Sequence, residues 1–196
     1  MPLPPRPPTA ADRLRAGTAD LHAAVEERID LDRLTESRGR YAELLRYFLS
    51  TVAPVEAALR AAGHEAARDD ASLLREDLAR LGEPAAESQT DFATPAAGAA
   101  GWGAAYVLEG SSLGGQVIAR AVRERLGLTP ETGASYFGRG AVRRATWPEF
   151  KARLNAGVRT ADEGVAAVAA ARAVFAHFIE TAACHWPAPT ETPAHV

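Results

Sequence analysis

The sequence predicts an all-α protein with a single compact domain of about six to eight helices. Hydrophobic residues make up 47% of the 196 residues, and many of them are alanine, the strongest helix former. Apolar residues recur with helical spacing over several long segments. No segment alternates with a period of two for long enough to predict a β-strand, and neither an internal repeat nor a shift in composition marks a second domain.

The first three helices are expected in the N-terminal half. Thr9 is a favourable N-cap residue, and the apolar positions after it repeat at spacings of three and four. A second helix is expected over residues 41–59, ending near Gly63. A shorter helix over residues 74–81 should end at Gly82, because glycine is the preferred residue just beyond a helix and a proline follows it.

Three more helix starts are predicted in the C-terminal half. Thr94 is followed by proline, the order typical of a helix N-terminus, and this helix should continue to Leu126. Two capping boxes, each a threonine with glutamate three residues later, lie at 146–149 and 160–163. The last helix is expected to pack four apolar residues into the core: Val165, Val168, Phe175 and Ile179.

Proline-rich ends are expected to flank the helical domain, which would cover residues 9–185. Residues 1–8 form a predicted disordered leader, without the apolar core of a signal peptide, and residues 186–196 a predicted disordered tail. No run of uninterrupted apolar residues approaches the ~18 needed to span a membrane. The single cysteine, Cys184, excludes an internal disulfide and is consistent with a cytoplasmic protein.

The charge distribution argues against nucleic-acid binding. The net charge is −3, and basic residues are interspersed with acidic ones rather than clustered on one segment.

The helix expected to end at Leu126 is unusual in carrying six glycines: Gly98, Gly101, Gly103, Gly110, Gly114 and Gly115. Each glycine inside a helix weakens it by about 1 kcal/mol relative to alanine. Gly110 and Gly114 share one face, and Ser111 and Gly115 form the adjacent pair. One interpretation is close helix packing, or a helix end at the paired glycines. The other is that a large, flat ligand lies against the bare backbone.

His22 is the candidate metal ligand. It lies beside the apolar stripe of the first helix, and Arg15 and Glu26 share its face. Glu26, one turn later, could orient the imidazole through a hydrogen bond, as in many metal sites, and Arg15 could bind an anionic group. The alternative is a partly buried histidine bonded to Glu26. No Glu-x-x-His repeat is present, which argues against a di-iron site.

Three segments resemble the haem oxygenase family. Residues 14–26 are similar to its proximal helix, in which a Leu-(Lys/Arg)-x-x-Thr-x-x-x-His-x-x-x-Glu pattern supplies the iron's histidine. Residues 105–118 resemble its distal helix, and residues 150–155 the helix that follows. The Leu-Glu-Gly-Ser form is most similar to a bacterial branch often encoded beside bacteriophytochromes. The resemblance runs in order over most of residues 9–183.

The resemblance implies a haem held between a proximal and a distal helix. His22 would be the axial ligand of the iron, and Glu26 its hydrogen-bond partner. The implied catalytic positions are Gly110 and Gly114, whose backbone would face bound oxygen, and Ser111, beside which an ordered water would deliver protons. The implied haem-binding positions are Arg15, Thr18, His22, Glu26, Gly110, Gly114, Gly115, Lys151 and Phe175, with Arg15 and Lys151 meeting the propionates.

Two positions depart from the family pattern. Many members carry an aspartate directly after the first distal glycine, where it holds a water network, and here that position is Ser111. A hydroxyl can still organise water, but it lacks the charge and the paired acceptors of a carboxylate. A tyrosine that often contacts a propionate is replaced by Ala105, with Tyr106 one step away.

The implied reaction cleaves haem to biliverdin, carbon monoxide and ferrous iron, with haem as both substrate and cofactor and with O2 as co-substrate. The sequence has no flavin or nicotinamide fingerprint, so an external reductant is expected, delivered by a ferredoxin or a flavoprotein reductase. A bacteriophytochrome is a candidate acceptor of the product. Two alternatives stay open: a haem-storage protein without turnover, which Ser111 favours, and a haem-free enzyme of the same fold.

Overall fold

Helices account for all the regular secondary structure in residues 7–85, 92 and 95–186, the part of the chain that this computed structural model describes, with the side chains of 140–145 left aside. No strand occurs in these residues, which confirms the predicted all-α class. The long helices are α1 (Ala10–Glu26), α3 (Arg38–Ala61), α4 (Asp70–Arg80), α5 (Gly98–Leu126), α7 (Gly140–Gly157) and α8 (Ala161–His185). Three short ones connect them: α2 (Leu31–Leu34), the 3-10 helix η1 (Pro130–Thr132) and α6 (Ser135–Gly138).

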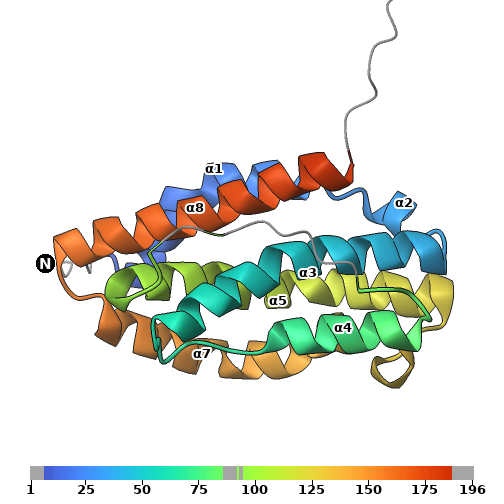
Figure 1. The fold of residues 1–196 in the computed structure, drawn as a ribbon. Helices are drawn as coiled ribbons and strands as arrows, with labels where there is room; N and C mark the ends of the chain where they lie inside the picture. The colour runs from blue at the N-terminus through green and yellow to red at the C-terminus, as the bar shows by residue number, and fades with distance from the viewer. Residues whose placement is uncertain (1–6, 86–91, 93–94, 187–196) are drawn as a thin grey trace, which may run out of the picture.

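The long helices stack in layers. Figure 1 shows α1 and α8 together on one side of the molecule, α3 and α5 in the middle, and α4 and α7 on the far side. Helix α5 packs against both α8 and α7, so it lies at the centre of the bundle. The core between the layers is apolar, and among its fully buried large side chains are Tyr47, Leu45, Leu74 and Phe137.

Local signals set several helix ends as predicted. Thr9 caps α1, and its hydroxyl accepts a hydrogen bond from the backbone N–H of Asp12. Thr160 caps α8 through the predicted capping box with Glu163. Gly63 lies just beyond α3 with a φ of +60°, a backbone conformation that glycine adopts without strain.

The predicted start of α5 at Thr94 is wrong in position. The helix begins at Gly98, and Thr94 itself lies outside the described residues. Gly98 has a φ of +54°, so the chain turns there before it can enter the helix, and the carbonyl oxygen of Gly98 lies 3.1 Å from Nε2 of His64.

The predicted helix start at the 146–149 capping box is also wrong, because α7 runs without a break from Gly140 and holds Pro148 in its interior. An interior proline costs roughly 3 kcal/mol. Aromatic contacts lie close to this proline: Trp147 stacks on Phe150 with ring centroids 5.4 Å apart and also contacts Tyr106.

The predicted buried stripe of α8 is right at two of its four positions. Phe175 is buried and Val168 packs against the core, whereas Val165 is 71% exposed and Ile179 is only half-buried. Trp186, assigned to the tail, contacts Tyr47 with ring centroids 4.8 Å apart. The remaining predicted tail and residues 1–6 of the predicted leader lie outside the described residues.

Close packing of α5 on α8 explains part of the glycine-rich sequence. A β-carbon built on Gly103 would lie 1.9 Å from the backbone oxygen of Ala167 in α8, a distance that no side chain can occupy.

Helix α8 is long and apolar enough to cross a membrane by length and composition alone. Half of that apolar stretch is buried inside the fold, as is common for the core helix of a globular domain.

Candidate functional site

A cavity of about 830 Å³ lies between α1 and α5, within the usual size range of ligand pockets. Side chains from α3, α7 and α8 complete its walls, and the lining is mainly apolar. Nine of the ten predicted site residues line this one cavity: Arg15, Thr18, His22, Glu26, Gly110, Ser111, Gly114, Gly115 and Phe175. Lys151, the tenth, is not among the lining residues.

His22 faces the cavity from α1. Its Nδ1 lies 3.5 Å from Oε2 of Glu26, one turn later in the helix. The imidazole also meets the ring of Phe175 edge-on, with centroids 5.8 Å apart. With Nδ1 turned toward a carboxylate, Nε2 is the nitrogen left to bind a metal, which is the usual arrangement of a metal-binding histidine.

The site offers a single histidine rather than a cluster of metal ligands. Among the described residues, no group of three or more His, Cys, Asp or Glu side chains is placed to hold a metal ion. A metal bound at His22 would therefore take its other ligands from something that fills the cavity. A flat macrocycle that carries its own ring of nitrogen donors fits this requirement.

The wall of the cavity that α5 forms exposes bare backbone at its glycines. A β-carbon built on Gly110 or Gly114 would meet no atom within 4 Å, because both positions open onto the cavity. Gly115 differs, since a β-carbon there would lie 3.0 Å from Cδ1 of Phe137 in α6. The two interpretations of the glycines therefore apply to different residues: Gly103 permits helix packing, whereas Gly110 and Gly114 leave space for a ligand.

The two polar residues of α1 beside His22 have different surroundings. Arg15 is exposed at the cavity, so its guanidinium can meet an anionic group. Burial raises the pKa of Tyr106 above its ordinary value, and the charge of Arg15 opposes that shift, which places the two residues near one another. Thr18 is buried, and its hydroxyl donates a 2.8 Å hydrogen bond to the carbonyl oxygen of Leu14.

The hydroxyl of Ser111 is committed to the protein rather than to the cavity. It donates a 2.8 Å hydrogen bond to the carbonyl oxygen of Leu108. The side chain of Tyr136 is also hydrogen-bonded to Ser111, and burial raises the pKa of Tyr136 to about 12. Because a serine hydroxyl has one hydrogen and two lone pairs, the oxygen of Ser111 can still accept a hydrogen bond from a water.

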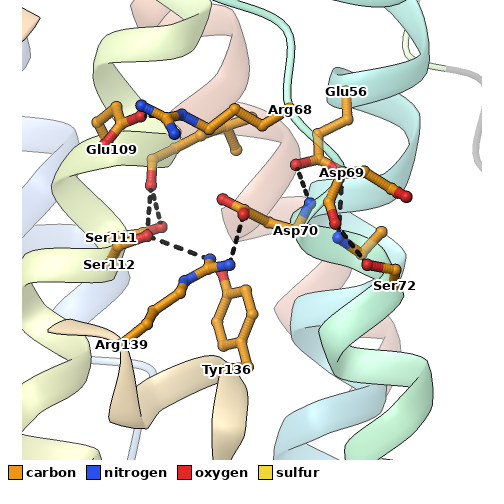
Figure 2. A network of polar contacts seen from close by, with 12 residues as sticks. Glu56, Arg68, Asp69, Asp70, Ser72, Glu109, Ser111, Ser112, Tyr136 and Arg139 are labelled. Atoms are coloured by element: carbon orange, nitrogen blue, oxygen red, sulfur yellow. Dashed lines mark hydrogen bonds and ion pairs between the residues drawn. The ribbon is translucent and has the colours of Figure 1, made fainter. Parts of the chain in front are cut away.

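Two ion pairs with largely buried carboxylates lie beside this segment of α5 (Figure 2). Glu109 pairs with Arg68. Arg139 pairs with Asp70, with 2.5 Å between Nη1 and Oδ1, and both side chains are only 13% exposed. Nη2 of Arg139 also donates a 3.3 Å hydrogen bond to Oγ of Ser112, which connects the second pair to α5.

Sequence reasoning missed two groups of residues near the site. The first is apolar and lines the cavity, and includes Phe48, Leu113, Val117 and Trp147. Leu113 and Val117 could have been found by extending the face of Gly110 at helical spacing. Val117 is 63% exposed because it borders the cavity. The second group is the buried ion pairs, whose partners are 41 or more positions apart in the sequence, so no local pattern indicates them.

Together, the fold and the cavity define an all-helical protein that presents one histidine opposite a glycine backbone. Comparisons with known proteins give the family. The family model described as Heme oxygenase matches residues 76–183. A heme oxygenase of Xanthomonas campestris pv. campestris (strain 8004) is 36% identical over 162 residues, which cover 81% of this chain and 93% of that protein. The chain therefore belongs to the haem oxygenase family.

A solved structure supports the same fold. The NO- and CO-bound heme oxygenase from Neisseria meningitidis matches with a TM-score of 0.79 at 23% identity, over 93% of this chain and 94% of that chain. The fold prediction is thus confirmed over nearly the full length of both proteins.

Proposed function

We propose that this chain binds haem in the cavity between α1 and α5 and cleaves it oxidatively to biliverdin, carbon monoxide and ferrous iron. The observation that carries the proposal is the placement of His22 across the cavity from the unobstructed backbone of Gly110 and Gly114. Membership of the haem oxygenase family supports it.

The residues present fit a haem. Nε2 of His22 would bind the iron, with Glu26 orienting the ring. The bare backbone of α5 leaves room for a flat ring and a small ligand, and Phe175 and the other apolar lining residues would cover the macrocycle. Arg15 would meet a propionate, and Lys151 is a second candidate for this role.

The chain's own contribution to the reaction is to bind, orient and exclude water. The bound haem would supply both the iron that activates oxygen and the ring carbon that is oxidised. The glycine backbone would admit oxygen at one defined place, where any side chain would block it. Ser111 would hold a water through a lone pair of its oxygen, and this water would deliver protons at the wall.

The electrons must come from another protein or a small reductant. A ferredoxin or a flavoprotein reductase is the proposed donor, acting in the cytoplasm. A bacteriophytochrome is a proposed acceptor of biliverdin, suggested by the Leu-Glu-Gly-Ser form of the distal segment.

The test is a His22→Ala variant studied with added haem. The side chain of His22 is 59% exposed, so the substitution should leave the thermal midpoint of the haem-free protein within a few degrees of the parent. The Soret absorption of the haem complex should shift, and biliverdin formation with ascorbate in air should be lost. An unchanged biliverdin yield would contradict the assignment of His22. A parent protein that binds haem but forms no biliverdin would support the storage alternative instead.

A further inference from the structure

The segment of α5 that borders the cavity lacks support on its cavity side. Glycines at 110, 114 and 115 weaken it as a helix, because each costs about 1 kcal/mol relative to alanine. Gly110 and Gly114 also have no atom within 4 Å of where a side chain would be. The order of this segment must therefore come from contacts on its other side.

Three of those contacts come from the short helix α6 and the residue directly after it. Phe137 packs on Gly115, so close that a β-carbon there would lie 3.0 Å away. Tyr136 is hydrogen-bonded to Ser111. Arg139 donates to Ser112, whose hydroxyl in turn donates a 3.2 Å hydrogen bond to the carbonyl oxygen of Leu108.

Helix α6 has only four residues, too few to be stable by itself, and α4 holds it at both ends. At the start of α6, the buried carboxylate of Asp77 accepts hydrogen bonds from the backbone N–H groups of Ser135 and Tyr136, at 2.9 and 2.8 Å. At its end, Asp70 pairs with Arg139.

Asp70 is itself fixed in place by α3. It is the first residue of α4, and its backbone N–H donates a 2.7 Å hydrogen bond to the carboxylate of Glu56, which is fully buried. Figure 2 shows this succession of contacts, from Glu56 through Asp70 and Arg139 to the serines of α5. It connects a rigid part of the core to the wall of the cavity.

We propose that the Asp70–Arg139 pair is a positioning device that fixes the backbone of residues 109–116 and so sets the shape of the cavity wall. Arg139 is suited to this role because its planar guanidinium can bind a carboxylate and a hydroxyl at once. Its effect on a bound ligand rests on the proposed haem oxygenase function, whereas its effect on the wall does not.

The least disruptive test is a Ser112→Ala variant. It removes the hydrogen bond from Arg139 to α5 and leaves the Asp70–Arg139 ion pair intact. Hydrogen exchange is measured on the haem-free protein. Amides 109–116 should exchange at least tenfold faster than in the parent, and the other helices should be unchanged. Thr51→Val in α3 is the matched control, since it also removes a buried hydroxyl that donates to the carbonyl oxygen four residues earlier, at 3.1 Å to Tyr47.

Three further variants test the pair itself. Asp70→Asn should accelerate exchange of the same amides, and Arg139→Lys should have a smaller effect than Arg139→Met because lysine retains the charge. Unchanged exchange of residues 109–116 in both Ser112→Ala and Asp70→Asn would overturn the proposal. Faster exchange spread over the whole protein would also overturn it, because the pair would then be a general stability element.

A haem-dependent measurement checks the consequence for a ligand. In the ferrous carbon monoxide complex, the C–O stretching band should shift or broaden in Ser112→Ala and stay unchanged in Thr51→Val. If the protein fails to bind haem, the proposed function fails, while the exchange result still decides the role of the pair.

Discussion

At the scale of single residues, the glycines of α5 differ in what surrounds them. Gly103 lies against the backbone of α8, where a β-carbon would come within 1.9 Å of a carbonyl oxygen. Gly114 faces the open cavity, where a β-carbon would touch nothing within 4 Å. Packing therefore requires glycine at position 103, whereas at position 114 the fold leaves room for a side chain.

This difference predicts opposite effects of two alanine substitutions. Gly114→Ala should stabilise the haem-free protein by up to about 1 kcal/mol, because alanine is the better helix former and nothing obstructs it. The same change should lower the rate of biliverdin formation, since the methyl group would occupy the space proposed for oxygen. Urea unfolding and a turnover assay measure the two effects.

Gly103→Ala is the control for this prediction, and it should destabilise the protein by about 1–3 kcal/mol or more, because the backbone of Ala167 cannot move away. A Gly114→Ala variant that is less stable than the parent would show that position 114 is constrained by the fold and not by a ligand.

At the scale of elements, α6 shows how a very short helix can be well defined. Its first turn is capped by a carboxylate from another helix rather than by a residue of its own. Asp77 is fully buried and accepts hydrogen bonds from two backbone N–H groups and from the Ser135 hydroxyl. The position of Phe137 against α5 depends on this cap.

Asp77→Asn should therefore destabilise the protein by about 2 kcal/mol, since an amide group cannot accept on both of its atoms and hydrogen bonds to charged groups contribute ~1.5–3 kcal/mol. Urea unfolding followed by circular dichroism measures the change. Asp20→Asn is the comparison, because Asp20 pairs with Arg172 but is 61% exposed, and exposed pairs contribute at most about 1 kcal/mol. Equal losses in the two variants would contradict the capping role of Asp77.

At the scale of the whole molecule, two histidines connect stability to pH. His177 is buried in α8, and burial lowers its pKa below the ordinary value. Burial also lowers the pKa of the half-buried His185. The folded state then binds fewer protons than the unfolded state at mildly acidic pH, so the free energy of unfolding should fall as the pH drops below about 6.5.

A His177→Gln variant tests this linkage. Glutamine does not titrate, so the fall in unfolding free energy between about pH 7.5 and pH 5.5 should be shallower in the variant than in the parent. Urea unfolding at a series of pH values gives the two slopes. Identical slopes would indicate that the histidine keeps its ordinary pKa in the folded protein.

The fold could be predicted largely from the sequence because its signals are local. Helical spacing of apolar residues, the threonine caps at Thr9 and Thr160 and the glycine at Gly63 each act within one turn of the chain. The helix start predicted from the 146–149 box is wrong, because α7 already begins at Gly140 and continues through Pro148.

The candidate site was predicted in part. His22, Glu26 and the glycines of α5 follow from helical spacing and a family resemblance, and they line one cavity. That Gly110 and Gly114 face open space, whereas Gly103 does not, depends on neighbouring helices and needed the tertiary structure.

By itself, the sequence determined which residues of this protein share a helix face, because those relations extend over three or four positions. Only the tertiary structure decided what supports the cavity wall. Asp70 lies in α4, Ser112 lies in α5 and Arg139 directly follows α6, and their contacts form only when the chain between them has folded back on itself. No spacing along the chain carries that information.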